Sequence, residues 1–197
     1  YEVARKYGIL YVADEVQSGM GRTGRMFAME HFGVAPDVVA LAKGIASGMP
    51  LGATIARSQI MDWEAGSHAS TFGGNPVACA AALATIQLLE ESLMAPARVQ
   101  GARLQNGLRT LQKDYECLGD VRGMGLMVGV EMVKDRVTKE RAQDLRNDII
   151  RGAYERGLLL LGCGQNTVRF CPALTVSDSE IDVALSIFEE AVRGAAG

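Results

Sequence analysis

The feature that most constrains this chain is a short apolar run that ends in a lysine and a glycine-rich turn. Residues Val38 to Ala42 lack the polar alternation of a half-exposed strand, so they predict a short strand buried on both faces. Lys43 follows directly, and glycines at 44, 48 and 52 with proline at 50 permit tight turns after it. A lysine at this position can be partly desolvated, which favours the neutral amine that attacks carbonyl groups. Without further signals, a lysine that extends from a strand end into solvent explains the pattern better.

A second apolar run delivers an acid to the end of another strand. Residues Ile9 to Ala13 predict another buried strand, and the sequence Asp-Glu-Val-Gln follows at positions 14 to 17. An aspartate can keep a pyridine nitrogen protonated while a lysine holds an aldehyde as a Schiff base. Enzymes that use pyridoxal 5'-phosphate (PLP) need both groups. An aspartate alone at a strand end is more often a cap of a turn or helix.

Three motifs in the first half of the chain resemble one enzyme family. They are Asp-Glu-Val-Gln-Ser-Gly at 14 to 19 with Gly-Arg-Thr-Gly at 21 to 24, Ala-Lys-Gly at 42 to 44, and Thr-Phe-Gly-Gly-Asn-Pro at 71 to 76. Their order and spacing resemble the class III (omega) aminotransferases of PLP fold type I, and most closely the 4-aminobutyrate and ornithine-type enzymes. The resemblance extends from the first residue to about Val192.

The resemblance implies an α/β fold with two parts. Residues 1–92 are expected to be the C-terminal part of the PLP-binding large domain, which has a mostly parallel sheet with helices. Residues 93–197 are expected to form a small α+β C-terminal domain. The chain begins with Tyr1 in what reads as the last turns of a helix, and the family's enzymes are considerably longer. We therefore expect a C-terminal fragment that lacks the loop for the cofactor phosphate.

The resemblance also assigns roles to residues. It implies that Lys43 is the catalytic residue and binds PLP, while Asp14 pairs with the pyridine nitrogen. Val16 is expected to pack on the ring, Gln17 to bind near its phenolic oxygen, and Thr71 to reach the phosphate held by the partner subunit of a homodimer with a shared active site. No metal site is expected.

Arg169 is the one candidate in the second half of the chain. It lies between Val168 and Phe170 in a predicted strand, where simple alternation points its side chain to solvent. The resemblance instead implies that Arg169 binds a substrate carboxylate through a two-pronged pair. We favour that role because the stretch from 168 to 172 matches the family.

The function implied is PLP-dependent transfer of an amino group from an omega-amino acid, of the 4-aminobutyrate or ornithine type, to 2-oxoglutarate or a similar oxo acid. A PLP-dependent racemase or aminomutase is an alternative, because the same lysine can return the proton to a different position. A non-catalytic truncated fragment is the third alternative.

The composition of the chain argues against nucleic acid and membranes as partners. The formal net charge of −3, with scattered Lys and Arg, offers no basic stripe for nucleic acid or an anionic membrane. No apolar run approaches the roughly 20 residues of a membrane span. The four cysteines form no Cys-x-x-Cys pair, so reduced thiols in a cytoplasmic protein are expected.

Overall fold

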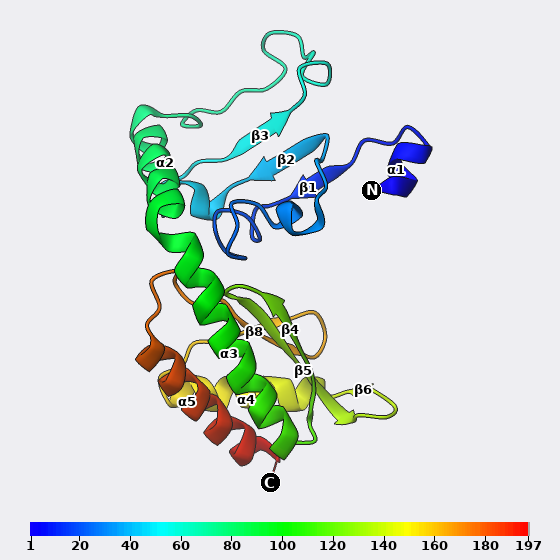
Figure 1. Cartoon of the computed structure of the whole chain (residues 1–197), viewed down its shortest axis with the longest axis vertical. Coiled ribbons are helices and arrows are strands. Elements are labelled where there is room, and N and C mark those ends of the chain that lie inside the picture. Colours follow the sequence, from blue (N-terminus) through cyan, green and yellow to red (C-terminus); the bar gives the residue numbers. More distant parts are fainter. Residues whose placement is uncertain (197) are drawn as a thin grey trace. The chain divides into compact units, whose positions relative to one another are not determined.

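The computed structural model describes residues 1–196, and the chain divides into two compact units, Tyr1–Met94 and Ala95–Gly197 (Figure 1). The predicted boundary after residue 92 lies two residues before this division. Both units combine a sheet with helices, which confirms the predicted α/β class. The assignment of the units to a large PLP-binding domain and a small domain stays a prediction.

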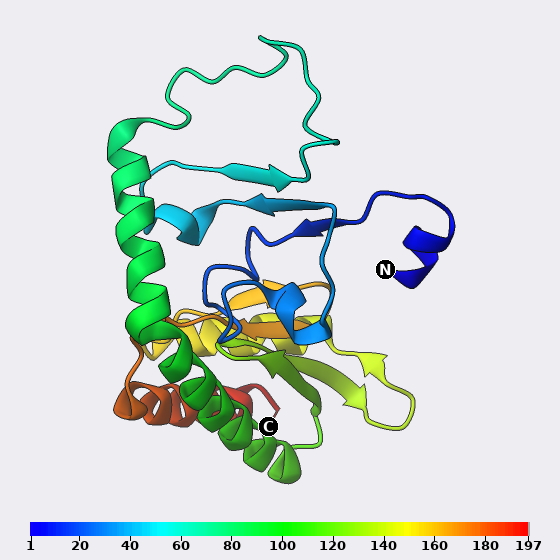
Figure 2. The ribbon, with the colours of Figure 1, turned by 45° about the horizontal axis from the view of Figure 1, so that its top comes forward.

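The first unit is built on a three-stranded sheet in the order β1-β2-β3 (Figure 2). Strand β1 (Val12–Asp14) runs parallel to β2 (Val38–Leu41), and β3 (Ala53–Ala56) is antiparallel to β2. The short helix α1 (Glu2–Lys6) precedes the sheet, and the 3-10 helices η1 (Ala28–Phe32) and η2 (Lys43–Ala46) connect its strands.

Both predicted strands exist, although the first lies at Val12–Asp14 and not at 9–13, and the prediction that they are buried was wrong. Val12 of β1 is 57% exposed, and in β2 only Leu41 is buried while the other three residues are half-buried. An apolar run indicates a strand that is stabilised by burial. The described residues pack against only part of this sheet, so some of its apolar side chains stay exposed. From the sequence alone we expect a short helix at 58–63, but in the structure these residues form turns and irregular structure.

The sequence predicts a helix that is capped by Asn75 and has Pro76 at its first position, and helix α2 (Pro76–Leu88) begins there. The Asn75 side-chain oxygen accepts the Ala78 backbone N–H at 2.9 Å, and Pro76 occupies the first helical position, where its missing N–H costs nothing. The apolar run at 77–84 predicts a helix that is buried on all sides. This prediction was wrong, because Val77 and Leu83 are 65% and 70% exposed.

The helix does not end where the organisation was expected to change, near 90–92. A π-helical turn, η3 (Leu89–Leu93), leads directly into α3 (Met94–Asp114). By length and composition alone, the run Pro76–Asp114 could cross a membrane, a property that it shares with core helices of soluble proteins.

The second unit is an α+β layer structure. Its antiparallel sheet has the order β4-β5-β8-β7, with β6 paired to β5. The core on one sheet face joins strand side chains such as Val130 to Leu108 of α3 and to Ile149 and Phe188 of two further helices. The elements are β4 (Leu118–Met124), β5 (Met127–Asp135), β6 (Glu140–Arg141), α4 (Gln143–Glu155), β7 (Leu161–Cys163), β8 (Thr167–Phe170) and α5 (Asp178–Ala196).

Local signals located two of these elements well. The sequence predicts a strand at 167–170 and a capping box formed by Ser177 and Glu180. Strand β8 has these bounds, and α5 begins with this box, in which the Glu180 carboxylate accepts the Ser177 backbone N–H at 2.8 Å. The apolar run at 158–161 predicts another strand, but the strand lies at Leu161–Cys163. Leu160 is buried in the core before that strand begins. The apolar run therefore reflects packing of side chains in the core and not hydrogen-bonded pairing with a neighbouring strand.

Candidate active site

Asp14 and Lys43 follow the same edge of the first sheet. Asp14 is the last residue of β1 and is paired in parallel register with Ala40 of β2. Strand β2 ends at Leu41, and Lys43 opens η2 two residues later. Because the carboxyl ends of parallel strands meet at one edge, an acid and an amine emerge there together.

The Asp14 carboxylate is exposed and held in place. Its Oδ1 accepts the Val16 backbone N–H at 3.1 Å, which fixes the orientation of the carboxylate relative to the following turn. Val16 is half-buried in that turn and Gln17 is exposed. Asp14, Val16 and Gln17, which were expected to touch a cofactor ring, therefore lie within four positions of one another at one strand end.

The Lys43 side chain is exposed, which corrects the expectation that it would be desolvated. The strand that precedes it is only half-covered, so no low-dielectric surroundings form around the amine within the described chain. The backbone of Lys43 is unusual, since its φ of 48° lies in the left-handed region, which residues other than glycine rarely adopt.

Three residues other than glycine with a left-handed backbone, Met20, Lys43 and Ser47, lie in the first unit at or near this turn. Four such residues occur in the described part of the chain, at Met20, Lys43, Ser47 and Lys139. Lys43 and Ser47 bracket η2, and a Cβ placed on Gly44 would be 3.4 Å from the Met20 Cβ. Strained backbone of this kind persists where the surroundings over-determine it, and it is typical of functional sites.

Glu15 is a site residue that sequence reasoning missed. It is 2% exposed, and its carboxylate accepts the Ser18 hydroxyl at 2.6 Å and the Met29 backbone N–H at 2.8 Å. Its own backbone N–H donates to the Ala40 carbonyl at 3.0 Å. Glu15 therefore anchors the loop behind Asp14. The available signal was a serine three residues after an acid at a strand end.

Thr71 lies in an exposed loop between β3 and α2. A hollow of about 500 Å³ lies between this loop and the sheet. Two of its lining residues, Ser70 and Gly73, flank Thr71 in sequence, and the rings of Trp63 and His68 lie 6.4 Å apart on its wall. The other lining residues are Ala40, Leu41, Gly52, Ala53, Thr54 and Met61.

Arg169 belongs to the second unit. It pairs with Gly129 of β5 and Leu161 of β7, and it is half-buried. Its neighbours Val168 and Phe170 are buried in the core, so strand alternation puts Arg169 on the opposite face of the sheet. Its substrate-binding role stays a prediction.

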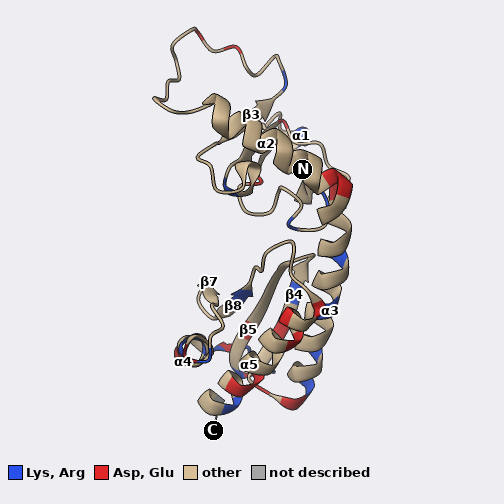
Figure 3. Cartoon of the chain, turned by 90° about the vertical axis from the view of Figure 1, so that its left-hand side faces the viewer, with Lys and Arg blue, Asp and Glu red and all other residues tan. Residues whose placement is uncertain are grey.

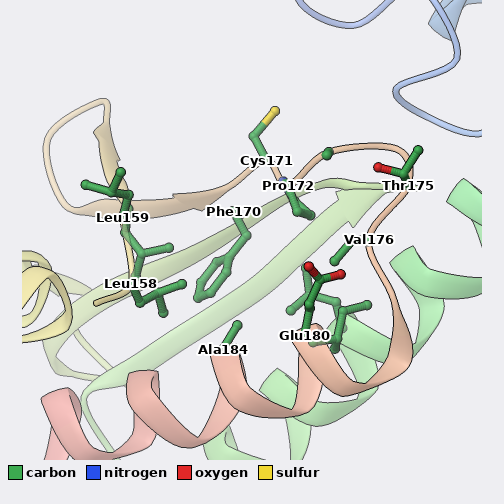
Figure 4. Close-up of a pocket in the computed structure, with 13 residues that line it drawn as sticks. Leu158, Leu159, Phe170, Cys171, Pro172, Thr175, Val176, Glu180 and Ala184 are labelled. Carbon is green, nitrogen blue, oxygen red and sulfur yellow. The ribbon is translucent and has the colours of Figure 1, made fainter. Parts of the chain in front are cut away.

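A second hollow of about 330 Å³ lies on the core side of this strand (Figure 4). The Phe170 ring and the Glu180 carboxylate both border it, and Cys171 lies at its edge. The remaining lining is mostly leucine, isoleucine, valine and alanine. The hollow is therefore a gap beside the apolar core of this unit, and it contains no group that fits the predicted chemistry.

The residues at the edge of the first sheet fit PLP. A carboxylate at a strand end suits the pyridine nitrogen, and an exposed amine at the neighbouring strand end suits an aldehyde. The described part of the chain contains no cluster of three or more His, Cys, Asp or Glu side chains that could hold a metal ion.

The profile of the class III aminotransferases matches residues 1–192. A leucine/methionine racemase of Thermococcus litoralis is 46% identical over 95% of this chain and 43% of its own length. An acetylornithine aminotransferase of Gloeobacter violaceus is 48% identical over 92% of this chain and 44% of its own length. Other relatives are named 5-aminovalerate and 4-aminobutyrate aminotransferases.

Solved structures agree with the sequence matches. An amine transaminase from an uncultivated Pseudomonas species, in its PLP-bound form, superimposes with a TM-score of 0.91 at 37% identity. The match covers 98% of this chain and 46% of that structure's chain. The chain thus spans less than half the length of the relatives that it matches.

Proposed function

Because the chain belongs to the class III aminotransferase family, we propose that it is part of a PLP-dependent aminotransferase. We propose as donor an omega-amino acid of the 4-aminobutyrate or ornithine type, and as acceptor 2-oxoglutarate or a similar oxo acid. The observation that carries the proposal is the emergence of Asp14 and Lys43 at one edge of the parallel strand pair. Class III aminotransferases depend on PLP, and the names of the relatives support the donor class.

Asp14 and Lys43 divide the chemistry between them. When bound, PLP supplies an aldehyde that takes up the substrate amine and a ring that accepts the electrons released at the substrate carbon. The Lys43 amine would hold the cofactor and then carry the proton as general base and acid. The Asp14 carboxylate, fixed by the Val16 N–H, would keep the ring nitrogen protonated.

The remaining predicted site residues bind and orient the cofactor and the substrate. In this proposal Val16 packs on the ring, Gln17 hydrogen-bonds beside its phenolic oxygen, and Thr71 contributes to binding of the phosphate. Arg169 holds a substrate carboxylate, because a guanidinium group presents two parallel donors to it.

A homodimer with a shared active site is also part of the proposal. Helix α2 carries no Lys, Arg, Asp or Glu, as its uniform tan colour in Figure 3 illustrates. Val77 and Leu83 of this helix are exposed. An uncharged helix with an exposed apolar side favours cover by a protein partner. The four free cysteines are consistent with action in the reducing cytoplasm, which we also propose.

A racemase is the second candidate function, and the similarity to the leucine/methionine racemase favours it. Both reactions would use the same Lys43 amine to remove a proton from the substrate carbon. The two differ in their products, because a racemase interconverts enantiomers without consuming 2-oxoglutarate. An assay of 2-oxoglutarate consumption alongside chiral analysis of the amino acid distinguishes them.

The first experiment tests the lysine directly. The purified chain is incubated with PLP and reduced with borohydride, and the modified lysine is mapped by mass spectrometry. We expect selective labelling at Lys43 and its loss in Lys43→Ala. Lys139→Ala is the matched control, because Lys139 is another exposed lysine with a left-handed backbone, and labelling should not change. Equal labelling of all the lysines would contradict a cofactor site in this chain.

A further inference from the structure

The turn that carries Lys43 is tied to helix α2 by one hydrogen bond between side chains. The Ser47 Oγ lies 2.9 Å from the Thr85 Oγ1. Ser47 is the residue that ends η2, and Thr85 is buried in the helix with 9% exposure. The bond joins residues that are 38 positions apart in the chain.

The direction of this hydrogen bond follows from the second contact of Thr85. Its hydroxyl donates to the Ala81 carbonyl at 2.8 Å, and a hydroxyl has only one hydrogen to donate. Ser47 is therefore the donor and Thr85 the acceptor. The Thr85 hydroxyl is fixed by its own helix, so it offers the Ser47 hydroxyl a rigid point of attachment.

The turn needs such an attachment because both of its ends are strained. Lys43 has a φ of 48° and Ser47 a φ of 47°. A left-handed backbone at a residue with a side chain costs roughly 1–2 kcal/mol, so without tertiary contacts these residues would relax to other conformations. Relaxation would move the Lys43 side chain away from the edge that it shares with Asp14.

We propose that Ser47 is a positioning residue for Lys43. Its hydrogen bond to Thr85 holds the strained turn in the conformation that presents the Lys43 amine beside the end of β1. The inference rests on the proposed function, since it assigns Ser47 a part in cofactor capture by Lys43.

Four variants isolate the bond. Ser47→Ala removes the donor and Thr85→Val the acceptor, and the double variant tests whether both changes break the same interaction. Thr85→Ser keeps the hydroxyl and should restore the behaviour of the unaltered chain. Ser92→Ala is the matched control, because the Ser92 hydroxyl also donates to the carbonyl four residues before it, that of Leu88, at 3.0 Å, in a turn without Lys43.

The first measurement is the rate of PLP attachment to Lys43, trapped by borohydride and counted by mass spectrometry. We expect Ser47→Ala and Thr85→Val each to slow attachment about fivefold, the equivalent of one hydrogen bond, and the double variant to be no slower. Thr85→Ser and Ser92→Ala should stay within about twofold. Unchanged attachment in Ser47→Ala, or equal slowing in Ser92→Ala, would overturn the proposal.

A second measurement needs no cofactor. Amide hydrogen exchange of residues 42–48 should be faster in Ser47→Ala and Thr85→Val than in the unaltered chain, and unchanged in Ser92→Ala. If the unaltered chain does not capture PLP selectively at Lys43, the proposed function fails. Exchange then decides whether Ser47 holds the turn, and equal exchange rates in all variants would reject that role.

Discussion

The Glu15 carboxylate accepts the backbone N–H of Met29 at 2.8 Å and so joins the end of β1 to the helix η1. Met29 is fourteen residues further along the chain. The same carboxylate accepts the Ser18 hydroxyl at 2.6 Å. With 2% exposure, Glu15 is the buried support of the loop that follows Asp14.

Replacing Glu15 should therefore destabilise the first unit. Glu15→Ala leaves two donors without their acceptor, and we expect a loss of about 2–3 kcal/mol in the free energy of unfolding. Glu15→Gln keeps one acceptor oxygen and should lose about half as much. Urea unfolding followed by the fluorescence of Trp63, the single tryptophan, measures both.

The control for this prediction is Glu30→Ala. The Glu30 carboxylate also accepts a backbone N–H, that of Phe27 at 2.8 Å, but Glu30 is exposed. Its replacement should cost less than about 1 kcal/mol, because water can take over the hydrogen bond. Equal losses for Glu15→Ala and Glu30→Ala would show that burial of Glu15 contributes nothing.

Signals within a few residues predicted much of this fold. Strand β8 and the capping box of Ser177 and Glu180 were located from local pattern alone, because strand alternation and capping depend on near neighbours. Two apolar runs predicted that Asp14 and Lys43 each lie at the end of a strand, whereas the structure supplies the parallel pairing of β1 and β2 that puts both ends at one edge.

The features that the sequence did not predict depend on contacts between residues that are far apart in the chain. The exposure of Val12 and Lys43 reflects what covers the sheet, which an apolar run cannot specify. The left-handed backbone of Lys43 and the Ser47–Thr85 hydrogen bond arise from packing of η2 against α2. No local preference of lysine or serine predicts them.

The first turn of α2 offers a test of a predicted cap. Asn75→Ala removes the oxygen that accepts the Ala78 N–H, and we expect a loss of about 1 kcal/mol in the free energy of unfolding. Asn75→Asp keeps an acceptor at the same position and should lose only a few tenths of a kcal/mol. Urea unfolding of the three proteins checks this order, and a loss in Asn75→Asp as large as in Asn75→Ala would contradict it.

The capping box of α5 should make stability depend on acid pH. The Ser177 backbone N–H and hydroxyl, which both donate to the Glu180 carboxylate, lower the pKa of Glu180 below its ordinary value. A lowered folded-state pKa gives a stabilising contribution that is complete above the ordinary glutamate pKa. The contribution disappears as the pH falls through the folded-state pKa.

Urea unfolding of the unaltered chain and of Ser177→Ala, between neutral pH and about pH 3, tests this dependence. The unaltered chain should lose more stability on acidification, because Ser177→Ala has already lost the hydroxyl donor. Identical pH profiles would show that the Ser177 hydroxyl does not affect the ionisation of Glu180.

Two glycines of α3 should differ sharply when each is replaced by alanine. A Cβ at Gly101 would overlap the backbone carbonyl of Gly125, which cannot move without displacing the turn between β4 and β5. A Cβ at Gly107 would meet a methyl carbon at the end of the Leu185 side chain, which can rotate. We expect Gly101→Ala to cost more than about 3 kcal/mol. Gly107→Ala should cost about 1 kcal/mol or less, since alanine's higher helix propensity offsets the repacking. Thermal unfolding followed by far-ultraviolet circular dichroism compares the two variants, and similar losses would mean that the contact between Gly101 and Gly125 yields as easily as a leucine side chain.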